Sequence, residues 1–245
     1  MNLPQTLHGR LYLLSYDRDR HCFDERKLPM LGYAARAAML TELYLTGYLT
    51  DDDGIARVVS SSRPADPLLS DTLAELTGRP ARTWTWLATG GSTSSAAPVR
   101  WQLESAGWID RCWRLSLGVI PVRRPGVCDE EAVERLADSV ARALQDAARG
   151  RHPDPRTLAL GQLAVLGDLP DQFLVHDVLP NPAEPSLPPV RGLKAAIELM
   201  TKIARQQTYS GGHRRGRLAG GFAAGGGCAG GFGCGGGCGG GCGGG

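Results

Sequence analysis

Apolar residues recur at helical spacing through most of the chain. Leu3, Leu7, Leu11 and Leu14 follow one another at intervals of four, four and three, which predicts a helix over residues 3–16. Residues 31–45 are rich in alanine and leucine, two strong helix formers, and predict a second helix. The beginning of the chain is therefore expected to be helical.

Later segments carry clear start signals for helices. Asp66 can cap a helix and Pro67 fits its first position, and Asp154 and Pro155 repeat this arrangement. Gly47 favours a helix end, since glycine readily adopts the left-handed backbone found there. Further amphipathic helices are predicted over residues 99–106, 128–149 and 190–207.

Two segments show the patterns of strands. Residues 55–60, IARVVS, follow the turn-like DDDG and read as one strand. In WIDRCWRLSLGVIPV, residues 108–122, apolar and other residues alternate with period two, which predicts a hairpin with two unlike faces. Its candidate membrane-inserting residues are Trp113, Leu115, Leu117, Val119 and Ile120.

These elements predict a mainly α fold: a compact helical domain with a few short strands and a protruding β-hairpin. The domain is expected over residues 1–208, with a proline-rich linker at 180–189 before the last helix. Residues 209–245 are dominated by glycine with sparse cysteine. Such a segment has little apolar surface to offset ordering entropy, so a disordered tail is expected.

Catalytic and metal-binding signals are weak. The five histidines stand apart, and GGSTS at residues 90–94 lacks the lysine and spacing of a phosphate-binding loop. DDD at residues 51–53 reads as a solvated turn. Cys234, Cys238 and Cys242 repeat every four residues, but glycine gives them no fixed geometry. No enzyme activity, cofactor or metal is expected.

Charge and hydropathy limit the class of protein further. The 245 residues have a formal net charge of +2, too balanced to indicate nucleic acid binding by itself. No stretch approaches the ~20 apolar residues of a membrane span, and the first ten residues lack a secretion signal. The scattered cysteines favour a reducing compartment. A cytoplasmic protein is the simplest interpretation.

Arg36 is unexpected, because it stands inside the apolar run GYAARAAMLTELYLTGYL at residues 32–49. A guanidinium near the start of a helix suits the oxygens of a phosphate group. Alternatively, Arg36 extends to solvent or pairs with a carboxylate. The residues alone leave both interpretations open.

Four segments together are similar to one known family. They are LYLLSYD, GYAARAAMLTELYLTGYL, RPADPLLSDTLAEL and DPRTLALGQLAVL, in this order and spacing. They resemble the Golgi phosphoprotein 3 family over roughly residues 3–206. The resemblance implies a compact helical domain that binds phosphatidylinositol 4-phosphate on membranes, with a hydrophobic hairpin that enters the bilayer. It also implies a peripheral, non-catalytic protein.

The resemblance implies a headgroup site as well. Arg36 matches the arginine that contacts the lipid phosphate in that family. The family's tryptophan, nine residues earlier, is replaced by Lys27. Two family arginines on the helix before the hairpin are missing from SSAAPV, and Arg100 just beyond is the candidate substitute. The expected headgroup-binding residues are therefore Arg36, Lys27 and Arg100. Because this set is incomplete, general binding to anionic surfaces is expected rather than selective recognition of one headgroup.

The hairpin supports membrane binding independently, since its apolar residues are flanked by arginines. Aromatic residues favour the membrane interface, and each nearby cation adds about 1 kcal/mol on anionic lipid. The expected partner is an anionic membrane surface or a phosphoinositide headgroup, with no nucleic acid. Two other functions stay open. One is a winged-helix DNA-binding protein, although PVRWQLESA makes a poor recognition helix; the other is an enzyme whose groups converge from afar.

Overall fold

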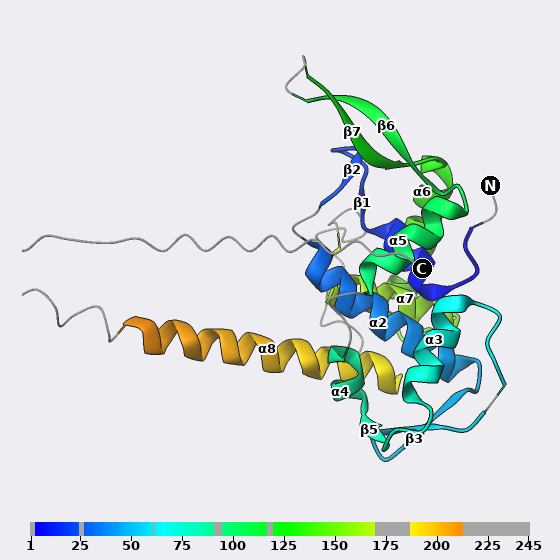
Figure 1. Ribbon diagram of the computed structural model, residues 1–245, viewed down its shortest axis with the longest axis vertical. Coiled ribbons are helices and arrows are strands. Elements are labelled where there is room, and N and C mark those ends of the chain that lie inside the picture. The colour runs from blue at the N-terminus through cyan, green and yellow to red at the C-terminus, as the bar shows by residue number, and fades with distance from the viewer. Residues whose placement is uncertain are drawn as a thin grey trace, which may run out of the picture. The chain divides into compact units, whose positions relative to one another are not determined.

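The computed structural model confirms the mainly α fold (Figure 1). It describes residues 3–24, 27–60, 62–90, 95–116, 120–169 and 187–212, and only the backbone at 111–124 and 202–212. Within these ranges there are eight helices and three small antiparallel sheets. The chain divides into two units, residues 1–203 and 204–245. All that follows concerns the first unit, except where α8 is described.

Helix α2, Leu28–Leu45, lies at the centre of the body and is buried along most of its length. It begins three residues before the predicted helix, with Pro29 in its first turn. Small alanines on α2 let neighbouring helices approach closely, and Ala34, Ala35, Ala37 and Ala38 are fully buried. The helices that pack on α2 are α1 (Leu7–Leu14), α3 (Pro67–Leu76), α4 (Trp84–Thr89), α5 (Ala96–Ser105) and α7 (Pro155–Leu166).

The predicted helix boundaries are confirmed by their capping geometry. The Asp66 carboxylate accepts a hydrogen bond from Leu69 N at 3.0 Å, and Asp154 accepts one from Thr157 N at 2.9 Å. Gly47 has φ +79° just after α2. Tyr48 N donates to Leu43 O there, which closes the helix in the expected glycine motif.

Two glycines allow the remaining helices to pack closely. Helix α6, Glu130–Ala148, lies against α7, and a Cβ at Gly161 would come within 2.8 Å of Leu144. Helix α8, Pro188–Gly212, buries Val190 and Leu193 completely in its first turns. A Cβ at Gly192 would lie 2.5 Å from the Cβ of Trp84 on α4. The predicted C-terminal helix thus covers part of the core.

The strands form three separate sheets. Strands β3 (Leu49–Asp52), β4 (Ile55–Val58) and β5 (Arg82–Thr83) make one, in the order β3-β4-β5. Strands β6 (Ile109–Ser116) and β7 (Ile120–Val127) form the predicted hairpin, which projects from the helices (Figure 1). The third is a small pair, β1 (Tyr16–Asp17) with β2 (Cys22–Phe23).

Some of the predicted organisation lies outside the described residues. This applies to most of the linker at 180–189 and to the tail from residue 213 onward. Helix α8 continues to Gly212, four residues past the predicted end of the domain at 208. Within the described ranges, every helix is too short or too polar to cross a bilayer.

Candidate functional site

Arg36 extends from α2 into the contact with α3, where it pairs with a carboxylate. Its guanidinium lies 2.8 Å from the Glu75 carboxylate and 3.4 Å from the Thr72 hydroxyl oxygen. The residue is only 5% exposed, and its Nε has no hydrogen-bond partner. Of the interpretations left open by the sequence, the structure shows the carboxylate pair. A lipid phosphate at Arg36 would compete with Glu75 for the guanidinium.

Glu75 also connects this buried pair to the surface. One carboxylate oxygen faces Arg36, and the other lies 3.5 Å from Arg79, four residues along the chain. The Glu75 side chain is one-third exposed. It therefore screens the buried arginine from one side and holds a surface arginine on the other.

Lys27 caps the start of α2 and contacts the loop after α7. Its ammonium donates to the Asp168 carbonyl at 2.7 Å and lies 3.7 Å from the Asp168 carboxylate. Nine helical residues correspond to about two and a half turns, or roughly 13 Å along the axis. Helix geometry therefore places Lys27 and Arg36 half a turn apart around α2, each with a different acidic partner.

Arg100 lies on α5 and pairs with Glu104 one turn later, at 2.7 Å. Both side chains are about 30% exposed (30% and 31%). Arg100 faces the neighbourhood of Tyr12 on α1, where burial of the phenol raises the pKa of Tyr12 to about 12. Each predicted headgroup residue thus has its own acidic partner, and a site shared by all three stays a prediction.

The hairpin is the second part of the predicted membrane site, and its register is regular. Eight residue pairs join β6 to β7, from Ile109–Val127 at the base to Ser116–Ile120 at the end. Position 113 is opposite 123, and 115 is opposite 121. The predicted positions Leu117 and Val119 lie outside the described residues. The backbone of residues 109–116 and 120–127 therefore forms a long two-stranded ribbon.

Charge along this ribbon is unevenly placed. Residues 115–122, LSLGVIPV, contain no charged side chain and occupy the end of the ribbon. Arginines stand at positions 111, 114, 123 and 124, between this end and the base. The sequence and register together define an uncharged tip with an arginine collar below it.

Tryptophans near the hairpin take two different roles. Trp108, directly before β6, is 4% exposed and belongs to the core. Trp101 on α5 is 71% exposed, beside Arg100. Its position was missed by sequence reasoning, because helical spacing alone does not show whether α5 turns this residue toward a neighbour.

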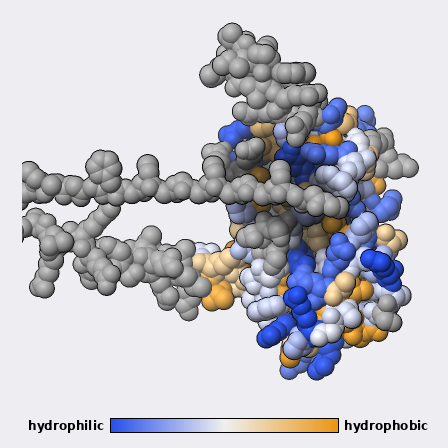
Figure 2. All heavy atoms as spheres, viewed as in Figure 1, coloured by the Kyte–Doolittle hydropathy of each residue, from blue (hydrophilic) through white to orange (hydrophobic). Residues whose placement is uncertain are grey.

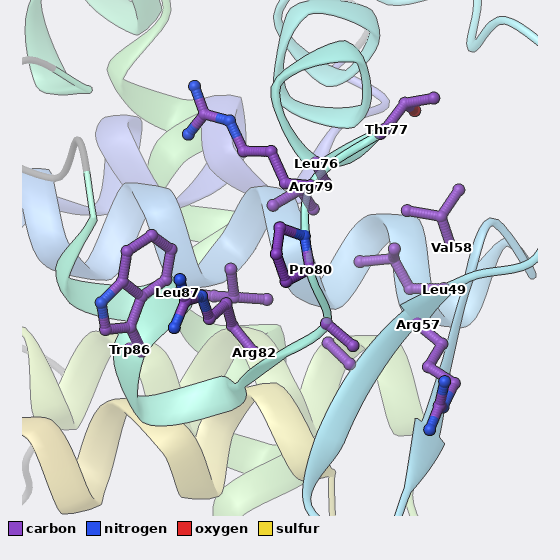
Figure 3. Close-up of a pocket in the computed structure, with 13 residues that line it drawn as sticks. Leu49, Arg57, Val58, Leu76, Thr77, Arg79, Pro80, Arg82, Trp86 and Leu87 are labelled. Atoms are coloured by element: carbon purple, nitrogen blue, oxygen red, sulfur yellow. The ribbon is translucent and has the colours of Figure 1, made fainter.

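A separate hollow lies at the sheet β3-β4-β5. This cavity of about 560 Å³ was also missed, since its walls come from three distant segments (Figure 3). Apolar residues and three arginines line it; the labelled ones in Figure 3 are Leu49, Arg57, Val58, Leu76, Thr77, Arg79, Pro80, Arg82, Trp86 and Leu87. The Arg82 guanidinium lies 5.1 Å from the centre of the Trp86 ring.

The described surface gives no other concentration of chemistry. Figure 2 shows hydrophilic and hydrophobic residues interspersed on the visible face of the body, so its apolar surface there is scattered. Among the residues the structure describes, no three histidine, cysteine, aspartate or glutamate side chains gather as metal ligands. The hairpin and the cavity are therefore the two features with a distinctive arrangement.

The protein is a helical domain from which an arginine-flanked hairpin projects. The model of one family, Golgi phosphoprotein 3, matches residues 7–201, and the chain belongs to this family. The family resemblance drawn from the four sequence segments is thus confirmed. A search of curated proteins finds no match to the chain.

Proposed function

We propose that the protein binds reversibly to anionic membrane surfaces, as a peripheral protein of the cytoplasm without catalytic activity. The observation that supports this best is the hairpin, which extends from the helical body with an uncharged tip and an arginine collar. Within the described structure, β6 and β7 pair with each other alone. Near its base, β7 contacts β2 and β6 contacts α5.

The dimensions of the ribbon suit shallow insertion. A strand rises about 3.3 Å per residue, so the uncharged half of the hairpin reaches roughly 10–13 Å beyond the arginine collar. Interfacial segments enter the headgroup region to a depth of about 5–10 Å. With the tip inserted, the collar lies at the level of the phosphates, where each arginine contributes about 1 kcal/mol on anionic lipid.

Backbone hydrogen bonds limit how a hairpin can insert. An unpaired N–H or C=O group in hydrocarbon costs several kcal/mol, so only the paired ribbon and its short turn can enter. The eight-pair ladder joins the two strands along their whole described length. Shallow insertion lets the outer edges remain in the hydrated interface.

The preferred lipid is the finer part of the proposal. The family resemblance favours phosphatidylinositol 4-phosphate, with Arg36, Lys27 and Arg100 as headgroup residues. In the structure Arg36 is occupied by Glu75, whereas Lys27 and Arg100 are partly exposed. We therefore expect the collar to provide most of the affinity for any anionic lipid, and headgroup selectivity to be modest.

Vesicle flotation tests the proposal. The full chain is mixed with neutral phosphatidylcholine vesicles, with vesicles containing phosphatidylserine, and with vesicles containing phosphatidylinositol 4-phosphate at matched total charge. Both anionic vesicles are expected to carry the protein upward, and neutral ones are not. Failure to float with all three would disprove membrane binding, and a shift of duplex DNA with steep salt dependence would favour the winged-helix alternative.

The hairpin variant is Leu115→Asp with Ile120→Asp. It removes two apolar side chains, each worth about 1.5–3 kcal/mol when buried, and adds charge that anionic lipid repels. Vesicle affinity should fall at least about 100-fold. Val59→Asp is the matched control, because Val59 is 60% exposed but lies next to β4 at the other end of the body. Equal loss in both variants would show that the hairpin has no special role.

A further inference from the structure

We propose that the cavity at the sheet β3-β4-β5 binds a small soluble organic anion, a compact apolar body that carries a phosphate or carboxylate group. The site is independent of the membrane proposal and uses none of its residues. Its volume of about 560 Å³ lies within the ~300–1,000 Å³ usual for small-molecule sites.

The hollow results from an interrupted ladder. Strand β4 pairs with β5 only at Ile55–Thr83 and Ala56–Arg82. Continuing this register would place position 57 opposite 81 and position 58 opposite Pro80. Pro80 has no N–H to donate to β4 at that position. The chain from Gly78 to Ala81 therefore leaves β4, and a cavity opens between them.

The floor of this cavity is apolar. Leu49 and Ala56 from the sheet, with Leu87 from α4, are almost fully buried and line it. Pro80 lies between the sheet side and the α4 side (Figure 3). Such a surface favours a ligand with an apolar body, since burying that body removes apolar area from water.

The polar groups gather on one side. Figure 3 shows Arg82 beside Trp86, with Arg79 extending on the same side of the cavity. Arg82 has no carboxylate partner within the described part of the chain, and it lies over the Trp86 ring at 5.1 Å. Trp86 is 45% exposed. A guanidinium attracted to a ring face in this way keeps N–H donors available for an anion.

The other two arginines differ in how firmly they are paired. Arg57 lies at the opposite side of the cavity and is bound to Asp52 at 2.5 Å. Arg79 lies 3.5 Å from Glu75, which also pairs at 2.8 Å with the buried Arg36. Glu75 is therefore largely satisfied by Arg36, and Arg79 can turn to a ligand. Arg79 and Arg82 are the two anion donors that the geometry indicates.

The position of the cavity favours a soluble ligand over a lipid headgroup. Strands β3 and β5 lie at one end of the body and the hairpin β6–β7 projects at the other (Figure 1). When the hairpin tip enters a bilayer, the cavity faces away from it. A lipid in the same membrane cannot then reach Arg79 and Arg82.

Isothermal titration calorimetry with the full chain tests this site. The probes are hexyl phosphate and hexanoate, compared with inorganic phosphate and hexanol, which each keep only one half of the expected ligand. At least one of the first two should bind with a Kd below about 1 mM. Inorganic phosphate and hexanol should bind at least about tenfold more weakly. No binding of either amphipathic anion at 5 mM would overturn the proposal, as would equal binding of hexanol.

Arg82→Gln and Arg79→Gln should each weaken binding of the amphipathic anion at least about tenfold, because each removes charged donors. Arg135→Gln on α6 is the matched control. Its side chain is 58% exposed, the same fraction as Arg79, and it also pairs with a glutamate four residues earlier. Equal weakening by the control would overturn the site.

Vesicle flotation distinguishes a soluble anion from a lipid headgroup as the ligand of Arg79 and Arg82. Arg82→Gln should leave flotation with phosphatidylserine vesicles unchanged, since the cavity does not face the membrane. Loss of flotation in this variant, with hexyl phosphate binding also lost, would assign the arginines to lipid and overturn the soluble ligand. The hairpin variant should retain hexyl phosphate binding, so the two proposals can fail separately.

Discussion

The two ends of the body use antiparallel pairing in opposite ways. At the hairpin end, β6 and β7 continue for eight pairs and carry the chain away from the helices. At the other end, β4 and β5 form two pairs and then separate at Pro80. A long ladder makes a projection and an interrupted one makes a recess. The two ends are therefore suited to different partners, a surface and a small molecule.

Arginine also has a different role at each end. In the hairpin, arginines flank an uncharged tip and suit an extended array of phosphates. In the cavity, arginines surround an apolar floor, and an aromatic ring or a carboxylate holds each one. A confined apolar floor beside a few charged donors favours ligands of one size and shape. The comparison predicts nonspecific, salt-dependent binding at the hairpin and selective binding at the cavity.

Among the variants that test the difference between the two ends, Gly192→Ala is expected to have the largest effect. The added Cβ would lie 2.5 Å from the Cβ and 2.7 Å from the backbone carbonyl carbon of Trp84, so rotamer changes cannot relieve the clash. Overpacking of this kind costs about 1–3 kcal/mol. We expect the free energy of unfolding in urea to fall by about 2 kcal/mol. Binding of hexyl phosphate should weaken, because α4 carries both Trp84 and Trp86.

Vesicle flotation of Gly192→Ala should be unchanged, since the hairpin is distant from α4 (Figure 1). Glu198→Ala on the same helix is the control, because Glu198 is exposed and faces no such contact. Parallel loss of vesicle and ligand binding in Gly192→Ala would mean that the two ends are not separable.

A smaller effect on stability is expected from Arg36→Met, which tests whether this arginine serves the α2–α3 contact or lipid binding. Breaking a buried ion pair costs about 3–5 kcal/mol, but Glu75 is one-third exposed and keeps Arg79. A loss of about 1.5 kcal/mol in the free energy of unfolding is therefore expected. A double-mutant cycle with Glu75→Gln should show that most of this loss is shared between the two residues.

The same variant separates a structural role from a lipid role. If Arg36 serves only the α2–α3 contact, vesicle flotation of Arg36→Met should stay within about twofold of the native protein at temperatures where it is folded. A tenfold or larger loss, specific to phosphatidylinositol 4-phosphate, would instead restore the headgroup role implied by the family.

The elements that could be predicted from the sequence depend on local chemistry. Asp66 and Asp154 were recognisable as caps because the residue type, the following proline and the apolar pattern agree. The hairpin followed from alternation. By contrast, α4 was not predicted, since its sequence WTWLAT is rich in tryptophan and threonine, which favour strands. Packing against α2 and α8 decides its conformation.

The candidate site was harder to predict, because its contacts join distant residues. Arg36 is 39 positions from Glu75, and no local pattern identifies that partner. The family resemblance identified Arg36 as important but did not show that a carboxylate occupies it. The cavity combines residues from 49–58, 76–82 and 86–87, so it exists only in the folded chain.

A hydrogen-bonded chain in the core links the helices of the two ends. His8 on α1 is fully buried, and its Nε2 lies 3.1 Å from the Gln102 side-chain oxygen on α5. The Gln102 amide donates to Asp66 at 2.5 Å, and Asp66 caps α3. Burial lowers the pKa of His8 below its ordinary value, despite the nearby Asp66 carboxylate. The native state therefore holds His8 neutral.

The smallest effect is a pH dependence of stability that arises from His8. Below about pH 6.5 the unfolded chain protonates this histidine, while the native state resists until the pH reaches its lowered pKa. Stability should thus fall as the pH drops through this window, by about 1 kcal/mol between pH 7.5 and 5.5 in urea unfolding. The lowered pKa of Asp154, caused first by its hydrogen bond with the Thr157 hydroxyl, acts only at more acidic pH.

Two variants test whether His8 causes this pH dependence of stability. His8→Gln should remove most of it, because the amide has no proton to gain. His152→Gln should retain it, since His152 is exposed. The native state keeps His8 neutral over this window, so the link from Gln102 to the cap of α3 should persist in the folded protein. A pH dependence that survives in His8→Gln would place the responsible titrating group outside this link.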